Sequence, residues 1–169
     1  APVSKVLMNP PFALKTNDEK EFKFIEHAIQ QMQREGLLFS VLPSSGMVKQ
    51  GKYLNWRRES LLRENSLLAV ITFPKDLFYP IGVETCAIIV KKGVSHPESQ
   101  KVLWVKVKHD GFLKSKGKRL PSNRVDNNLK EFTELIKSFT KNQNITVNNK
   151  PEQIKVMAID FSDRNLELL

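Results

Sequence analysis

The residues best suited to chemistry in this chain are Asn9, Pro10, Pro11 and Phe12, which follow the apolar segment Val6 to Met8. Proline fixes its own φ angle, and a residue before proline is restricted to extended conformations, so the two prolines stiffen this loop. Neither proline has a backbone N–H, so the loop offers carbonyl acceptors with few competing donors. The side-chain oxygen of Asn9 adds a second acceptor, and Phe12 adds a flat apolar surface.

Two fixed acceptors beside an aromatic ring predict a planar substrate that carries an exocyclic amino group. The leading candidate is the N6 amine of adenine, whose two protons match the two acceptors. Its lone pair is delocalised into the purine, so the nitrogen is a weak nucleophile until hydrogen bonds to both protons favour a tetrahedral geometry. Rigid acceptors supply this help without reorganisation in the transition state, and no titratable general base is needed at that stage.

The elements that position this loop alternate between strands and helices, which predicts an α/β fold with a mixed sheet, helices on both faces and an antiparallel last strand, residues 84–91, paired with residues 67–73. Strands are expected over residues 3–8, 37–42, 67–73, 84–91, 102–107 and 154–161, and helices over residues 19–34, 54–64 and 128–139. Gly36 is placed to end the first helix. Residues 46–52 are expected to form an exposed loop, and Arg57 and Arg58 to face solvent.

Composition and charge narrow the classes of partner. The 169 residues carry 27 Lys and Arg against 18 Asp and Glu, a net charge of +9 that favours a polyanion, with nucleic acid first. Residues 101–119 alone hold seven basic side chains and one acid. A single cysteine, Cys86, and three scattered histidines predict neither an internal disulfide nor a structural zinc site. No apolar run approaches the roughly 20 residues of a membrane span, and no signal peptide is visible, so we expect a cytoplasmic protein without a membrane partner.

The segment from Val6 to Phe12 resembles the catalytic motif of amino-group DNA methyltransferases, the class that includes the modification subunits of type I restriction–modification systems. Residues 42–46, 73–85 and 88–92 are similar to the adenine-specific members of that family in order and spacing. The resemblance covers about residues 3–139. It implies a partial Rossmann-like, S-adenosylmethionine-dependent fold and methyl transfer to adenine N6 in double-stranded DNA, after the base is flipped from the duplex.

The resemblance also assigns roles to individual residues. Asn9 and the Pro10 carbonyl would accept the N6 protons, Phe12 would stack on the base, and Phe78, or else Tyr79, would cover its other face. The charge of the later stretch, apart from the resemblance, predicts contacts to the DNA backbone from its basic residues: Lys106, Lys108, Lys114, Lys116, Lys118 and Arg119. Specificity and restriction subunits would be the protein partners.

One departure from the family pattern concerns the cofactor. The family holds S-adenosylmethionine with a Gly-rich turn and an acidic residue upstream of the catalytic loop, and this sequence contains neither. We therefore expect residues 1–93 to be the second half of a catalytic domain and residues 94–169 to add a basic strand and a helical extension. The isolated chain is expected to be inactive.

Other interpretations remain open at this point. The chain is also consistent with a noncatalytic nucleic-acid-binding or assembly module that retains the fold, or with an RNA or protein N-methyltransferase. Phe78 and Tyr79 would equally serve to fill the core beneath their loop. The basic stretch is also typical of a solvated surface, although phosphate contact needs no sequence specificity and would use such a surface.

Overall fold

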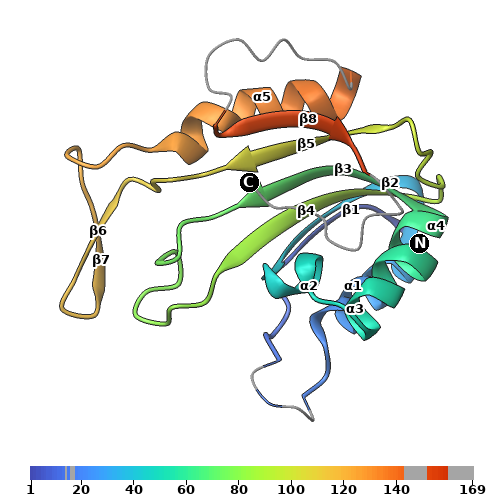
Figure 1. Ribbon diagram of the computed structural model, residues 1–169, viewed down its shortest axis with the longest axis horizontal. Coiled ribbons are helices and arrows are strands. Elements are labelled where there is room, and N and C mark those ends of the chain that lie inside the picture. The colour runs from blue at the N-terminus through green and yellow to red at the C-terminus, as the bar shows by residue number, and fades with distance from the viewer. Residues whose placement is uncertain (14, 16–17, 143–151, 160–169) are drawn as a thin grey trace.

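The computed structural model describes residues 1–13, 15, 18–142 and 152–159. Its centre is a sheet of six strands in the order β1-β2-β4-β3-β5-β8, accompanied by a separate two-stranded ribbon, β6-β7 (Figure 1). The strands are β1 (Val3–Met8), β2 (Met32–Pro43), β3 (Asn65–Thr72), β4 (Thr85–Lys92), β5 (Lys101–Lys106), β6 (Phe112–Ser115), β7 (Lys118–Pro121) and β8 (Ile154–Ala158). The helical segments are α1 (Glu21–Gln31), α2 (Ser45–Val48), α3 (Lys52–Asn55), η1 (Trp56–Leu61), α4 (Leu62–Glu64) and α5 (Asn128–Asn142).

The strand directions bring the carboxyl ends of four strands to one side of the sheet, which is called the functional edge below. Strand β1 is parallel to β2, and β3 is parallel to β5, whereas β4 runs antiparallel between β2 and β3. Strands β1, β2, β3 and β5 therefore all point the same way, and their carboxyl ends meet at the left-hand side of Figure 1. The last strand, β8, is antiparallel to β5. The predicted mixed sheet is confirmed, and so is the antiparallel pairing of the strand expected at residues 84–91 with the strand expected at residues 67–73, which form β4 and β3.

The central strands β3 and β4 are buried because helices cover both faces of the sheet, whereas the edge strands β1 and β8 are largely exposed. Along β4, Cys86, Ile88 and Val90 join a core cluster with α1 and η1, while Ala87 and Ile89 join a second cluster with α5. This alternation follows from the period of two in a strand, in which successive side chains point to opposite faces. The continuous apolar sequence of β3 and β4 has the same cause, since neither face is exposed to water.

The transition from α1 to β2 differs from the prediction. Helix α1 ends at Gln31, and the chain enters the sheet at Met32, which pairs with Val3 of β1. The next pair joins Lys5 to Leu37, so residues 33–36 form a bulge in which Glu35 has a φ of 63°. Gly36 does not end the helix but lies in β2. A Cβ at this position would approach the Ser4 carbonyl oxygen to 3.0 Å, so the close contact with β1 favours glycine.

The segment after β2 is also more ordered than expected. Residues 46–52 do not form one exposed loop, because Ser45–Val48 is a helical turn that buries Gly46 and Met47. Arg57 was expected to face solvent, but its side chain is only 2% exposed and its Nη1 donates a hydrogen bond to the Gly46 carbonyl oxygen at 2.9 Å. Burial, with a smaller effect of Arg58, lowers the pKa of Arg57 to about 10. The guanidinium therefore joins α2 to η1.

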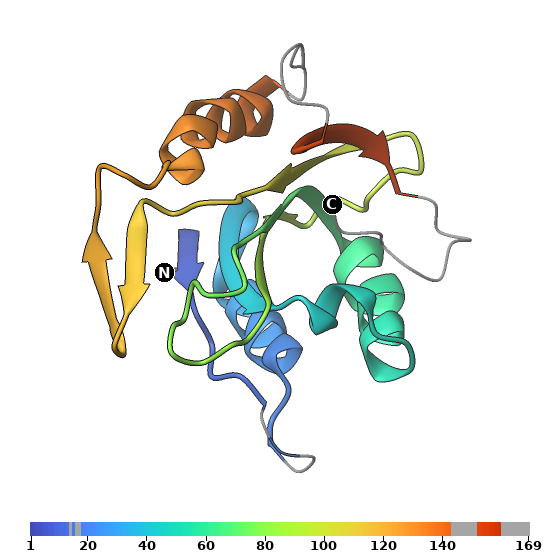
Figure 2. The same cartoon turned by 60° about the vertical axis from the view of Figure 1, so that its left-hand side comes forward.

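Residues after position 93 extend the same sheet and add the ribbon. Strand β5 pairs with β3, and β8 pairs with β5, whereas the ribbon stands away from the sheet in Figure 2. Its turn contains Lys116 with a φ of 47° and Gly117 with a φ of 75°. The separation of residues 1–93 from residues 94–169 as two units stays a prediction. Residues 160 and 161 of the last expected strand lie outside the described residues.

Candidate active site

The Asn9–Phe12 loop begins at the functional edge of the sheet, directly after β1. Pro10 is buried, Asn9 and Pro11 are exposed, and Phe12 is half-buried. The buried proline anchors the loop, while the amide of Asn9 stays accessible to a ligand. In open α/β sheets, ligands bind outside the carboxyl ends of the strands, so this loop occupies the expected position for a catalytic segment.

Phe12 lies against Phe78, which belongs to the connection between β3 and β4. Their ring centroids are 5.6 Å apart with an interplanar angle of 84°, an edge-to-face contact. Both side chains are half-buried, so neither ring is sealed inside the core. The structure therefore brings together two aromatic residues that the sequence singled out separately. Their role in binding a base stays a prediction.

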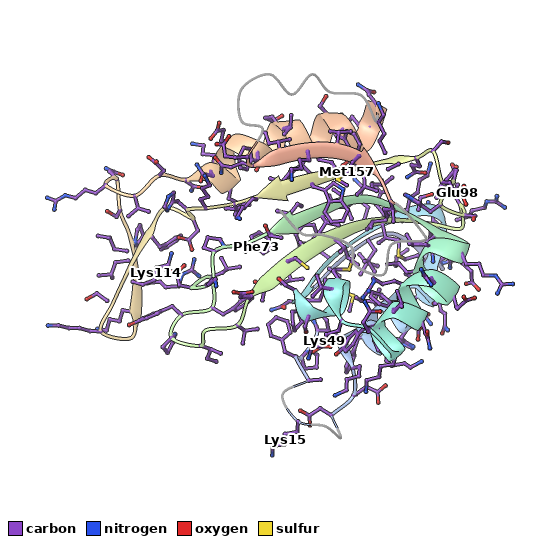
Figure 3. All side chains as sticks on the ribbon, viewed as in Figure 1. Lys15, Lys49, Phe73, Glu98, Lys114 and Met157 are labelled. Atoms are coloured by element: carbon purple, nitrogen blue, oxygen red, sulfur yellow. The ribbon has the colours of Figure 1, made fainter. Side chains whose placement is uncertain are left out.

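Tyr79 points to the ribbon and not to Phe12. Its hydroxyl oxygen accepts a hydrogen bond from the Gly117 N–H at 3.2 Å. A second link joins Asp76 of the same connection to Lys114 of β6, with 3.4 Å between Oδ2 and Nζ; Figure 3 labels Lys114 where the ribbon faces this connection. The connection that carries Phe78 is thus attached to the ribbon at two points.

Asp110 organises the base of the ribbon. Its carboxylate is 2% exposed and accepts hydrogen bonds from Lys114 Nζ at 2.5 Å and Arg119 Nη2 at 2.8 Å. Burial alone would raise the pKa of Asp110, but the hydrogen bonds from Lys114 and the Phe112 amide and the two cationic charges lower it overall. Arg119 also lies over the Phe112 ring, 4.5 Å from its centroid. Two of the six expected DNA contacts therefore also serve within the fold.

The other four basic residues of that set, Lys106, Lys108, Lys116 and Lys118, are exposed. Lys116 and Lys118 lie at the tip of the ribbon. Lys106 and Lys108 line a cavity of about 500 Å³ at the carboxyl ends of β3 and β5. The cavity is lined by Ser44, Val48, Thr72, Phe73, Pro74, Lys75, Glu84, Lys106, Val107 and Lys108.

This cavity combines an aromatic wall with cationic groups. Phe73, labelled in Figure 3, follows β3 at the functional edge. Lys75 is paired with Glu84 at 2.6 Å, which leaves Lys106 and Lys108 as the cations best placed to meet an anion there. Another cavity, of about 470 Å³, lies between β1, β2, β4 and α5; its lining is largely apolar and comes from the middle of the strands, away from the Asn9–Phe12 loop.

Two searches of the described residues concern metal-ligand groups and long apolar helices. Among residues 1–13, 15, 18–142 and 152–159, no three His, Cys, Asp or Glu side chains gather as a metal site would require. Within the same ranges, no helix has the length and apolar character needed to cross a bilayer.

Two polar residues close to the loop were not singled out from the sequence. Glu21, at the start of α1, is 3% exposed, and Tyr53 of α3 is half-buried beside it. Glu21 bonds to Ala13 and Tyr53, which lie 8 and 32 positions away along the chain, so no local sequence pattern predicts these contacts.

Comparison with known proteins gives a consistent set of relatives. A family model described as N-6 DNA Methylase matches residues 3–166. The restriction enzyme and methyltransferase RM.BcgI of Heyndrickxia coagulans, described as type II, is 35% identical over 115 residues, which are 66% of this chain and 18% of that protein.

Solved structures show the same fold at low identity. The methyltransferase subunit of a type I restriction–modification system from Streptococcus thermophilus superposes with a TM-score of 0.67 and 18% identity, covering 93% of this chain and 35% of that one. The M protein of the type I enzyme EcoKI gives a TM-score of 0.61 and 18% identity, over 82% of this chain and 31% of that one. The chain thus spans about a third of these two subunits and less than a fifth of RM.BcgI.

Proposed function

Because this chain belongs to the N-6 DNA methylase family, we propose that it carries the catalytic loop of an enzyme that methylates adenine N6 in double-stranded DNA. The observation that carries the proposal is the contact between Phe12 and Phe78 beside Asn9, at the carboxyl edge of the sheet. The family membership and the relation to restriction–modification methyltransferases support the reaction class.

In this proposal the loop acts by holding the target amine. The Asn9 side-chain oxygen and the Pro10 carbonyl oxygen accept the two N6 protons and draw the nitrogen towards a tetrahedral geometry. The methyl carbon would form its new bond to N6 as its bond to the donor sulfur breaks, the donor would leave as the neutral thioether, and one N6 proton would pass to solvent. Fixed acceptors of this kind stabilise the charge that develops on the nitrogen.

The aromatic pair would serve the flipped base. A base sandwiched between Phe12 and Phe78 needs parallel rings at a wider spacing, whereas the present rings meet at 84°. Binding would therefore replace an edge-to-face contact worth about 0.5–1.5 kcal/mol with two stacking contacts, each worth about 1–3 kcal/mol.

S-adenosylmethionine is the methyl donor in this proposal, and it supplies an electrophilic methyl group. The Gly-rich turn and the acidic residue with which the family holds it are not found in this sequence. Gly46, after β2, is buried and packs against Leu42 so closely that a Cβ would lie 2.8 Å from Leu42 Cδ1, so this glycine serves the packing of α2. We therefore assign the main cofactor contacts to parts of the enzyme other than these residues, and expect this chain alone to be inactive.

The partners in this proposal are duplex DNA and, as in type I systems, specificity and restriction subunits in the cytoplasm. The six basic residues named above would contact DNA phosphates, and Lys116 and Lys118 are exposed at the ribbon tip. Replacing both with Gln should lower the slope of log affinity against log salt by about 2. The matched change of Lys130 and Lys137 on α5 should leave the slope unchanged.

The decisive experiment uses the natural protein that contains this sequence, with any subunits it requires. It is incubated with S-adenosylmethionine and genomic DNA copied by polymerase chain reaction, which carries no base methylation, and the nucleosides are analysed by mass spectrometry. We expect N6-methyladenine from the natural protein, at least about a 100-fold loss in Asn9→Ala, and no loss in Asn55→Ala, which changes an exposed residue of α3.

The alternatives give different results. DNA binding without methylation by the natural protein would favour a noncatalytic module, and methyl transfer to RNA or protein alone would favour another N-methyltransferase. Full activity in Asn9→Ala would refute the assigned role of the loop.

A further inference from the structure

A buried carboxylate lies behind the catalytic loop. Glu21 is the first residue of α1 and is 3% exposed. Its Oε1 accepts a hydrogen bond from the Ala13 N–H at 2.6 Å, and its Oε2 accepts one from the Tyr53 hydroxyl at 3.1 Å. Each carboxylate oxygen therefore has a donor, which offsets the cost of removing the charge from water.

The position of Glu21 also favours its charge. The N-terminus of a helix carries partial positive charge, and a carboxylate in the first turn is stabilised by it. However, Glu21 does not cap its own helix, because its two hydrogen bonds go to residues outside α1. A helix-capping role therefore does not account for these contacts.

The first contact fixes the end of the catalytic loop. The Ala13 N–H belongs to the peptide unit that joins Phe12 to Ala13, so the hydrogen bond to Glu21 holds that unit in place. At the other end of the loop, β1 and the buried Pro10 hold the chain. Since Pro10 and Pro11 have no N–H, they offer no amide by which the loop could be held between these points.

The second contact ties Glu21 to a rigid aromatic group. The Tyr53 ring meets Phe22 edge-on at 5.5 Å, and Phe22 stacks on Trp56 at 5.5 Å with an interplanar angle of 20°. Phe22 and Trp56 are buried, at 7% and 4% exposure. Burial and the nearby Glu21 charge raise the pKa of Tyr53 to about 12, so its hydroxyl stays protonated as a donor at neutral pH.

We propose that Glu21 is a positioning residue for methyl transfer, which holds the Phe12–Ala13 peptide so that Asn9, the Pro10 carbonyl and the Phe12 ring meet the target base in a fixed arrangement. This inference rests on the function proposed above. Misplacement of a reacting group by about 1 Å can cost on the order of 100-fold in rate, so a loop held at one end only should be a poor catalyst even when it binds DNA well.

The test uses two variants, one that removes the charge of the side chain and one that shortens it. Glu21→Gln keeps the length and an oxygen that can accept from Ala13, whereas Glu21→Asp keeps the charge but is one methylene shorter. In the natural protein, we expect kcat for DNA methylation to fall by about 10- to 100-fold in Glu21→Asp and by less than about 3-fold in Glu21→Gln. KM for DNA should change by less than about 2-fold in both, because phosphate contacts elsewhere dominate binding.

Hydrogen–deuterium exchange supplies a readout that does not depend on activity. The peptide that contains Phe12 and Ala13 should exchange faster in Glu21→Asp and at the natural rate in Glu21→Gln. Glu26→Ala, on the same helix but paired with Lys23 at 2.9 Å, is the control and should change neither rate. Tyr53→Phe, which removes only the hydroxyl, should lower kcat by about 2- to 5-fold.

The proposal is overturned if Glu21→Asp keeps the natural kcat and the natural exchange rate. It is also overturned if Glu21→Gln lowers kcat and speeds exchange as much as Glu21→Asp does. Absence of methylation by the natural protein would instead refute the proposed function, and the exchange experiment would still report whether Glu21 holds the loop.

Discussion

The buried histidine after β4 predicts a measurable dependence of stability on pH. His96 is 4% exposed, and its backbone N–H donates to the Leu62 carbonyl oxygen at 2.9 Å. Burial lowers the pKa of His96 from 6.5 to about 4. The unfolded chain therefore binds more protons than the folded chain between these values, and stability falls as pH decreases from 6.5 to 4. At 1.36 kcal/mol for each pH unit, the loss reaches at most about 3 kcal/mol.

The assay is urea unfolding, followed by circular dichroism at pH 7, 6, 5 and 4, of the natural chain and of His96→Gln, which cannot be protonated in this range. The difference in unfolding free energy between the two should shrink by about 3 kcal/mol from pH 7 to pH 4. Asp110, with its lowered pKa, loses its contribution only as pH falls below 3.8, so it does not mask the effect. A difference that stays constant within about 0.5 kcal/mol would refute the reasoning.

Three further predictions concern buried polar groups. Arg57→Ala should lower the unfolding free energy by about 1–3 kcal/mol, because it leaves the Gly46 carbonyl without its donor. The control is Arg63→Ala: 72% of the Arg63 side chain is exposed, so this change should alter the unfolding free energy by less than about 0.5 kcal/mol. Equal losses in urea unfolding would contradict the prediction. Asp110→Ala should cost about 2–3 kcal/mol and speed tryptic cleavage at the ribbon tip, because Arg119 loses the Asp110 carboxylate and Lys114 keeps only the longer pair with Asp76. Unchanged cleavage would contradict this. Burial raises the pKa of Cys86 to about 12, so an aromatic disulfide reagent at pH 8 should label it only on unfolding, and rapid labelling of the folded chain would show that the thiol is accessible.

The central strands could be predicted from the sequence because a strand buried on both faces is a continuous run of apolar residues. The apolar segments of β3 and β4 can only be strands between two layers of helices, and their short separation favours antiparallel pairing. The sequence also pointed to Phe12 and Phe78, through two motifs at the same edge, although their edge-to-face contact requires the folded chain.

The errors arose where tertiary contacts override local pattern. The periodicity of α1 continues past Gln31, but pairing with Val3 draws Met32 into the sheet. A hydrophobicity pattern places every arginine at the surface, but Arg57 is buried because the Gly46 carbonyl oxygen accepts its hydrogen bond. The ribbon escaped prediction because its two strands have four residues each and little apolar character.

The two separate core clusters have a consequence for how this protein can vary. The aromatic residues packed beside Glu21, which are Phe22, Tyr53 and Trp56, belong to the α1 side of the sheet, whereas Phe132 and Phe139 of α5 belong to the other. The sheet therefore separates a layer that, in the proposed function, holds the Asn9–Phe12 loop from a layer that needs only to remain apolar. Subunit contacts or new surface properties could be acquired on the α5 side without disturbing the geometry around Asn9.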